Sequence, residues 1–496
     1  MAAIRSVVPL ELTALELSSS SEYIIRRRQS EIPANESSNF GSVSNVYRTQ
    51  FNIGSSGVEW LDGPNCYFKC NLTVAAATAT ANTDIQAYLD EGGIHSLIKS
   101  VEIRLRNGTR LEFIENYNKY YSVLSNLRHS PDHIESVESH LSGDSMGHFP
   151  AIDPYRPHPA DTVIPVANEL KITADTDGQL YRQPRALFAN GTQHTAVFKL
   201  ASNFLNNIKY LPLPMLQQLQ IVIEWERASL GMFMHKKATA NPPAVLGTPV
   251  AIVDAADTIN YTVSSPVFVA NLVEPSPSVV ASFEKMYKES SVDLYFLSHR
   301  TQRKIETSAA INMEVSTQFR SARYVLSVIC QDEAFAESGN AKGYPSNSTF
   351  RKSGMTSFVY KSGGMRFPEH GPINTSVAYG AEALNSALIA VKQHGSIQHD
   401  TRIRPWQFVS DYNKKYYDTT GLKTIADSTK FIIGASLCRG GDFTGADLTQ
   451  NTLFLEATFD AGAGANTYVG NKNVLTIIGF DAVLSLSARS GAVLRY

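Results

Sequence analysis

The stretch KYLPLPMLQQLQIVIEWE, residues 209–226, lies near the middle of this 496-residue chain and decides how the rest is divided. Its second half alternates between apolar and polar positions, and only Val222 breaks the alternation. The apolar positions are Leu219, Ile221, Ile223 and Trp225. A period of two is the pattern of a β-strand with one buried face and one solvated face. The sequence therefore predicts a long amphipathic strand here.

The run Leu211-Pro212-Leu213-Pro214 comes directly before this strand. Each proline lacks an amide donor and fixes φ, so the run cannot lie inside a sheet. We expect a rigid extended elbow that leads into the strand. Because a polar Ala/Pro-rich segment follows at residues 228–258, the strand is expected to close a first β domain, with a second domain after it.

The same strand-and-turn pattern extends outward from this stretch. Residues 98–106 alternate, Asn107-Gly108 is a strong hairpin signal, and residues 110–114 return. Residues 117–127 then have helical spacing. In the second half, residues 358–360, a Gly363-Gly364 turn, residues 365–367 and an Ala/Leu-rich helical stretch at 381–393 repeat that order, and 219–226 and 474–486 are the long strands that end the two halves.

This internal symmetry indicates an all-β chain. Many short strands separated by Gly and Pro turns are typical of a sandwich or barrel, and jelly rolls also protect strand edges. We predict two consecutive jelly-roll β-sandwiches, each with a short helix insertion. The expected domains are an N-terminal arm (1–45), a first jelly roll (46–227), a linker (228–262) and a second jelly roll with a C-terminal tail (263–496).

Composition limits the classes of function. Charged residues make up only 18% of the chain, which suits a surface used for contacts between subunits but also a β-rich secreted protein. The formal net charge of −2 gives no overall attraction to nucleic acid. Four cysteines in a chain of this length do not form a disulfide framework, so a reducing compartment is favoured, with Cys66 and Cys70 as small core residues. No signal peptide and no apolar run of membrane-spanning length is found.

The N-terminal arm contains the one concentrated basic run, Arg26, Arg27 and Arg28. Residues 7–17 before it are apolar with two glutamates and predict a short helix. The arginines are either a solvated charge cluster or part of an arm that touches an anionic surface.

Catalytic chemistry has one motif in its favour. Gly143 to Gly147 read G-x-S-x-G around Ser145, and Asp153 and His158 follow in the order of a hydrolase triad. That mechanism needs a strand before the serine and a helix after it, whereas residues 134–141 read as helix or loop and several prolines follow. The motif is therefore expected to be a surface loop.

Metal binding has two weak signals. Histidines and acidic residues gather in one long Ser/His/Pro-rich segment: His129, Asp132, His133, Glu135, Glu138, His140, His148 and His158. Pro131 interrupts the helical spacing and no HExxH motif is present, so a polar surface loop is the simpler interpretation. Gly440-Gly441-Asp442, Gly445 and Asp447 echo a calcium nonapeptide only once, which favours a turn. No cofactor and no metal is expected.

Three stretches resemble the major capsid proteins of small eukaryotic DNA viruses, the virophage, Polinton (adintovirus) and Polinton-like virus group. They are residues 211–225, residues 98–124 (IKSVEIRLRNGTRLEFIENYNKYYSVL) and residues 363–373 (GGMRFPEHGPI). In that family a hairpin strand ends in an Asn-Tyr-Asn-like start to a helix, here Asn116-Tyr117-Asn118, and a Pro-Leu-Pro-like elbow precedes the last strand of the first jelly roll. The pattern covers most of residues 46–487.

The resemblance implies a double jelly roll that stands upright in a viral shell. Three copies would form a trimer with a pseudo-hexagonal outline, and such trimers would tile an icosahedral capsid inside the host cell. Contacts between copies are expected in residues 126–165 and 331–352. The arm with Arg26, Arg27 and Arg28 is expected to face the interior, against genomic DNA or an internal membrane, and penton and minor capsid proteins would be further partners.

The predicted function is thus a viral structural protein of the virion, a major capsid protein, and not an enzyme. The alternative is a two-domain β-sandwich protein that binds carbohydrate or a receptor and stays monomeric. An enzyme using Ser145 or the histidines is a third hypothesis. Measurement of the mass in solution separates the first of these from the others.

Overall fold

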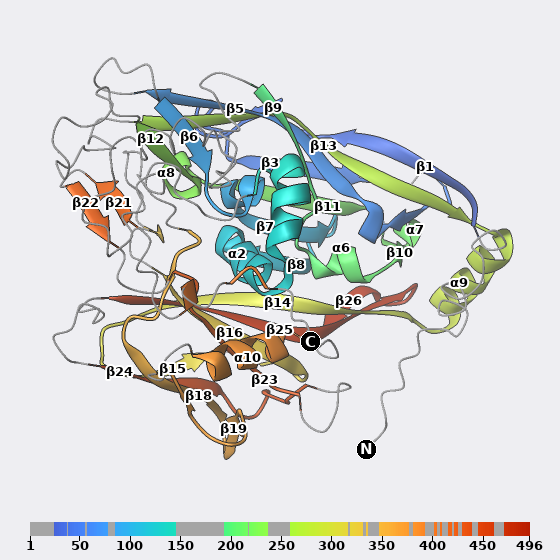
Figure 1. Ribbon diagram of the computed structural model, residues 1–496. Coiled ribbons are helices and arrows are strands. Elements are labelled where there is room, and N and C mark those ends of the chain that lie inside the picture. The colour runs from blue at the N-terminus through green and yellow to red at the C-terminus, as the bar shows by residue number, and fades with distance from the viewer. Residues whose placement is uncertain are drawn as a thin grey trace.

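Figure 1 shows the computed structural model of the chain as two stacked β-sandwiches, with helices α2 (Tyr117–Arg128) and α6 (Asn203–Asn207) between them. The structure describes residues 24–36, 38–54, 57–77, 85–144, 193–216, 218–236, 258–315, 318–330, 334–335, 347–375, 380–391, 401–403, 407–408, 415–418, 421–424, 429–438, 445–460 and 471–496. No helix in these ranges is long and apolar enough to cross a membrane.

The first sandwich consists of two antiparallel sheets. One has the order β10-β4-β13-β5-β9, with β1 and β2 also paired to β13; the other has the order β3-β11-β7-β8. The strands of the first sheet are β1 (Ile24–Pro33), β2 (Asn39–Phe40), β4 (Trp60–Asp62), β5 (Tyr67–Ala77), β9 (Gln193–Phe198), β10 (Tyr210–Leu211) and β13 (Thr258–Pro275). Those of the second are β3 (Arg48–Ile53), β7 (Ile98–Leu105), β8 (Arg110–Glu115) and β11 (Leu219–Trp225). A separate pair joins β6 (Ile85–Leu89) and β12 (Met232–Lys236).

The second sandwich has the same plan. One sheet has the order β14-β25-β16-β17, with β23 on β16 and β26 on β25; the other has the order β15-β24-β18-β19, with β20 on β18. The first sheet contains β14 (Val292–Glu306), β16 (Ala322–Cys330), β17 (Phe350–Arg351), β23 (Ile432–Ser436), β25 (Lys472–Ser487) and β26 (Gly491–Arg495). The second contains β15 (Ala310–Val315), β18 (Met355–Ser362), β19 (Met365–Phe367), β20 (Ile373–Asn374) and β24 (Leu453–Phe459); β21 (Lys415–Asp418) and β22 (Gly421–Thr424) form a hairpin.

Strand for strand, the two sandwiches correspond. The order β1-β13-β5-β9 matches β14-β25-β16-β23, and β3-β11-β7-β8 matches β15-β24-β18-β19. Along the chain, successive strands of this set alternate between the two sheets of their sandwich. The exceptions are one hairpin in each sandwich, β7–β8 and β18–β19, whose two strands lie in the same sheet. That order is a jelly roll. The prediction of two consecutive jelly-roll sandwiches is confirmed.

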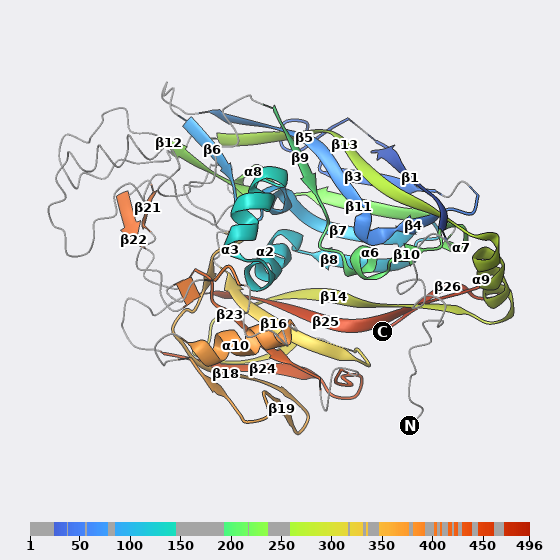
Figure 2. The ribbon, with the colours of Figure 1, turned by 45° about the vertical axis from the view of Figure 1, so that its right-hand side comes forward.

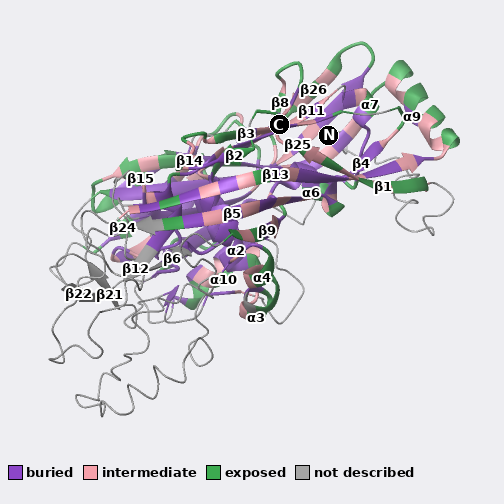
Figure 3. Ribbon diagram, turned by 90° about the horizontal axis from the view of Figure 1, so that it is seen from above, coloured by how far each residue is buried: buried purple, intermediate pink, exposed green. Residues whose placement is uncertain are grey.

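The helix insertions also correspond. Helix α2 follows the β7–β8 hairpin, and α10 (Ala381–Ala390) follows β19 and β20, as the internal symmetry of the sequence predicted. The Asn-Gly turn lies between β7 and β8, where Gly108 has a φ of 87° that a side chain would disfavour. Helix α9 (Pro277–Glu289) was not expected; it joins the two sandwiches at one end of the molecule and is mostly exposed in Figure 3. It is anchored by Phe283, whose ring centroid lies 4.7 Å from that of Trp60.

The opening stretch behaves largely as its pattern indicates. In β11 the alternating apolar side chains are buried, and Val222, on the opposite face, is buried as well. The extended elbow was wrong in part: Tyr210 and Leu211 form β10, and α7 (Leu213–Leu216) is a helical turn. Pro214 fits there because the first turn of a helix leaves its amide groups unpaired.

The strand order also differs from the expected role of β11 as the closing strand. The chain returns after it, and β13 pairs with β5, β4 and β1, all in the first sandwich. Residues 258–275 therefore pair with the first sandwich, and the counterpart of β25 is β13 rather than β11. Likewise β1, inside the range expected to be an arm, forms nine backbone partnerships with β13 from Ile24 to Pro33. The boundaries at 45, 227 and 262 remain predictions.

The core of each sandwich is filled by side chains from both sheets. In the first sandwich, the ring centroid of Phe68 lies 5.4 Å from that of Phe51 and 4.8 Å from that of Phe268. Cys66, Cys70 and Cys330 are buried free thiols, and Cys438 is a partly exposed free thiol. Cys66 and Cys70 thus act as small core side chains, as expected.

Candidate functional site

The site with the most elaborate chemistry lies where the two sandwiches meet. Figure 2 shows α2, α6 and β8 of the first sandwich facing β14 and β25 of the second. Thr301 on β14 donates a hydrogen bond of 2.7 Å to the backbone oxygen of Glu115 at the end of β8. Residues 401–403 lie against α2, where the Arg402 amide donates to the backbone oxygen of Asn126 over 3.1 Å. We describe this region as the inter-sandwich interface.

Charged side chains are buried within the inter-sandwich interface. Asp90, Glu91 and Asp144 come from the first half of the chain, and Arg402 and Lys430 from the second. All five are at most 2% exposed. Such charges are tolerated inside a protein only when they are paired and hydrogen-bonded.

The pairing is specific. The Arg402 guanidinium donates to both carboxylate oxygens of Asp144, over 3.0 and 3.1 Å, in the bidentate geometry that suits arginine. Lys430 donates to Glu91, whose carboxylate also lies 3.7 Å from Arg402. Burial lowers the pKa of Lys430 to about 7, and the negative charge of Asp90 opposes that shift.

The backbone of the second half also enters this network. Asp90 accepts from the Asn347 amide over 2.8 Å and from the Ser348 hydroxyl over 2.7 Å. Lys119 on α2 donates to the side-chain oxygen of Asn347 over 3.0 Å. Part of the range expected to contact other copies, residues 331–352, is therefore used within the chain.

A second, neutral network is centred on His299 of β14. The Asn203 amide donates to Nδ1 of His299 over 2.9 Å, so this nitrogen is an acceptor and the proton lies on Nε2, which bonds the Tyr324 hydroxyl. The Tyr120 hydroxyl also lies 2.9 Å from Nδ1. Burial lowers the pKa of His299 to about 3, and the charge of Arg128 adds to this shift. His299 is therefore a neutral bridge between the sandwiches.

The predicted basic run is split by the structure. Arg26, Arg27 and Arg28 lie on β1, opposite Glu274, Val273 and Leu272 of β13. Arg26 and Arg27 are exposed. Arg28 donates to both carboxylate oxygens of Glu59, over 2.5 and 2.6 Å, which raises its pKa. Residues 7–17 lie outside the described residues.

Of the G-x-S-x-G motif at residues 143–147, the structure describes only Gly143 and Asp144. Asp144 is the buried partner of Arg402 and also accepts from the Gly92 amide over 2.6 Å. Ser145, Asp153 and His158 lie outside the described residues. Asp144, which precedes Ser145, thus stabilises the inter-sandwich interface. No local signal in the sequence indicates this role.

The histidine-rich segment forms short helical turns after α2: α3 (Pro131–His133), a π-helical turn over Ile134–Glu138 and α4 (Ser139–Leu141). The rings of His129 and His133 have centroids 5.1 Å apart, and His133 lies 3.5 Å from Glu138. Within the ranges that the structure describes, no three His, Cys, Asp or Glu side chains are placed to hold a metal ion. His148 lies outside those ranges.

The calcium-like turn is described only in its second part. Residues 440–442 lie outside the described residues, and Gly445 packs against the backbone of Ala322. Asp447 accepts from the amide and the hydroxyl of Thr449 over 2.9 and 2.7 Å, which lowers its pKa. This is an aspartate turn in which the carboxylate bonds its own backbone.

Comparison with known proteins places the fold. No family model and no curated protein sequence matches the chain. A chain in the cryo-EM structure of the Sputnik virophage aligns with a TM-score of 0.57 and 12% identity, covering 96% of this chain and 89% of that one. The chain is a double jelly roll. The Faustovirus major capsid protein aligns with a TM-score of 0.50 and 11% identity over 97% of this double jelly roll and 94% of its own length.

The first prediction concerns the buried ion pair of Arg402. We expect Arg402→Met to lower the free energy of unfolding by roughly 3–5 kcal/mol, because Asp144 keeps its buried charge and loses its partner. Urea denaturation measures this. The matched control is Arg110→Met, which removes an exposed pair with Glu102 and is expected to cost at most about 1 kcal/mol. Equal losses in the two variants would contradict the assigned role of Arg402.

The second prediction concerns pH. His299 has a folded-state pKa of about 3 against 6.5 unfolded, so below pH 6.5 the unfolded chain binds a proton that the folded chain does not. The free energy of unfolding should therefore fall on acidification, by about 2 kcal/mol between pH 7 and pH 5 from this group alone. We expect His299→Gln to reduce the pH dependence by that amount in urea denaturation at both pH values. An unchanged slope for His299→Gln would refute the assignment.

Proposed function

We propose that this chain is the major capsid protein of a DNA virus related to the virophage, Polinton (adintovirus) and Polinton-like group. One observation carries the proposal: two jelly rolls with matching strand orders in a single chain, a fold that aligns with the Faustovirus major capsid protein over nearly the full length of both chains. In this role the chain is structural, and its partners are first of all copies of itself. Three copies would form a capsomer with a pseudo-hexagonal outline in an icosahedral virion.

The two ends of the subunit support an orientation in the shell. At one end, Ile24 pairs with Pro275 just before α9. At the other end, Ala77 pairs with Thr258. The connection through residues 78–84 therefore starts at this end, and the connection through residues 237–257 finishes at it. The start of β1 thus lies opposite the end from which the longer connections of the first sandwich arise. We propose that the α9 end faces the capsid interior.

Residues 1–23 precede β1 in the chain, and β1 begins at the α9 end. Arg26 and Arg27, exposed on β1, would add positive charge beside them, while Arg28 is held by Glu59. An anionic layer beneath the capsomer, genomic DNA or an internal membrane, would suit these two cations. Contacts with neighbouring copies and with penton and minor capsid proteins would use the flanks of the sandwiches and the loops within residues 126–165 and 331–352.

The third prediction is the mass of the particle in solution. A capsomer of this kind has obligate interfaces, which bury thousands of Å² and do not dissociate on dilution. We expect a stable species of three times 54.4 kDa in analytical ultracentrifugation across a wide range of concentration. A strict monomer at high concentration would contradict the capsid proposal and favour a two-domain β-sandwich protein that binds carbohydrate or a receptor.

The fourth prediction separates the arm from the strand beside it. Deletion of residues 1–23 leaves β1 intact, so we expect normal thermal stability and trimers but defective shells in electron microscopy. Deletion of residues 1–33 removes β1 and exposes the edge of β13, so the melting temperature should fall as well. Complete shells formed without residues 1–23 would show that the arm does not tie the capsid together.

A further inference from the structure

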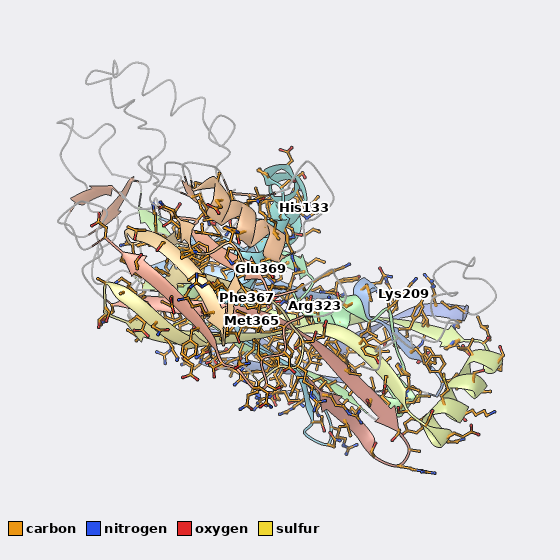
Figure 4. The ribbon with its side chains drawn as sticks, turned by 90° about the horizontal axis from the view of Figure 1, so that it is seen from below. His133, Lys209, Arg323, Met365, Phe367 and Glu369 are labelled. Atoms are coloured by element: carbon orange, nitrogen blue, oxygen red, sulfur yellow. The ribbon has the colours of Figure 1, made fainter. Side chains whose placement is uncertain are left out.

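The inter-sandwich interface does not close completely. A cavity of about 400 Å³ lies between α2 and α6 of the first sandwich and β14, β16 and β25 of the second. The polar residues that line it are Arg128, Asn203, Asn207, Arg323, Tyr324 and Asp481, and the apolar ones are Leu297 and Val391. Figure 4 labels Arg323 near the centre of the view from below. The cavity is thus lined by two guanidinium groups, one carboxylate, amide side chains, a tyrosine and a small apolar surface.

One of the two arginines is already neutralised. Arg323 donates to Asp481 over 2.7 Å, and Ser321 donates to the same carboxylate oxygen over 2.5 Å. The attraction of Asp481 raises the pKa of Arg323 against the effect of burial. This pair contributes hydrogen-bonding groups to the cavity without net charge.

Arg128 is different. It is exposed in the last turn of α2, and within the described residues no carboxylate forms an ion pair with it. Its charge helps to lower the pKa of the nearby His299. Its charge and a hydrogen bond to Tyr324, a lining residue, oppose the rise that burial causes in the pKa of Tyr324. Because His299 is neutral, Arg128 gives this cavity a net positive charge.

We propose that the cavity binds the carboxylate of an acidic side chain presented by another protein, with Arg128 as the cationic anchor. The planar guanidinium offers two parallel donors to a carboxylate, and the Asn207 amide lies at the same cavity as a further donor. Leu297 and Val391 would contact the methylene groups of a glutamate. A carboxylate thus supplies the negative charge that the cavity lacks.

Nucleic acid is a poorer match to the same chemistry. Binding to DNA or RNA depends on neutralising many phosphates, whereas this cavity has one uncompensated arginine. The site lies within a single chain, so the inference does not depend on the capsid proposal. Failure of either can be recognised without the other.

The test uses the full-length protein and calorimetric titration with the peptide acetyl-Ala-Glu-Leu-amide. We expect one site per chain for this peptide and no binding of acetyl-Ala-Gln-Leu-amide. Arg128→Gln should weaken the affinity roughly 10- to 100-fold, because a charge-assisted hydrogen-bonded pair is lost. The control is Arg300→Gln, an exposed arginine on β14 that does not line the cavity; its affinity should stay within about twofold of the unmodified chain.

Several results would overturn the proposal: equal binding of the two peptides, no binding of the glutamate peptide, or an affinity unchanged in Arg128→Gln. Inorganic phosphate is included as a competitor, and displacement of the peptide at equal concentration would assign the cavity to small anions instead. If Arg128→Gln does not fold, Arg128→Lys is used. It keeps the charge but loses the planar pair of donors, so weaker binding at an unchanged melting temperature is expected, and unchanged affinity would count against the carboxylate geometry.

Discussion

The arrangement of the two sandwiches depends on charges that neither sandwich can bury alone. Asp90, Glu91 and Asp144 would lie in a desolvated interface without counter-charges if Arg402 and Lys430 moved away. An unpaired buried ion costs several kcal/mol, whereas apolar contact is non-directional and tolerates sliding. The hydrogen-bonded charges pair in one relative position, so we infer that they select it. The neutral bridge of His299 to Asn203 and Tyr120 adds a second fixed point beside them.

Local pattern was sufficient for much of the fold. Alternation identified β11, the Asn-Gly turn identified the β7–β8 hairpin, and the repeated order of strand, turn, strand and helix revealed two similar halves. Local pattern failed where the two strands of a pair lie far apart in the sequence. Strand β13 follows a Pro- and Ala-rich segment that resembles a domain boundary, yet its partners lie about 190 residues earlier, as Val263 opposite Leu72 shows. Strand β1 was missed for the same reason, because its polar residues fit an edge strand of a sheet as well as they fit an extended arm.

The interface could not be predicted from the sequence for a related reason. Lys430 and Glu91 are 339 residues apart, and Arg402 and Asp144 are 258 apart. Each is an ordinary charged residue in a polar segment, so nothing local distinguishes it from a solvated one. Asp144 shows the difficulty most clearly: the surrounding G-x-S-x-G letters point to a catalytic turn, whereas its carboxylate binds a buried guanidinium. The segments expected to contact other copies contribute Asn347 and Ser348 to the same network.

The stability of the single chain explains why some of the cationic side chains at the inter-sandwich interface are present, but it explains Arg128 less well. Arg402 and Lys430 are required by the carboxylates that they neutralise, and Arg323 by Asp481. Arg128 gains from its place at the C-terminal end of α2, but that effect contributes only about 0.3–1 kcal/mol and a lysine would serve as well. The Arg128 guanidinium also forms a hydrogen bond to Tyr324, but a planar group with five N–H donors offers more donors than these two roles use. The remaining role is therefore sought outside the chain, in a carboxylate that completes the charge balance which the rest of the interface achieves internally.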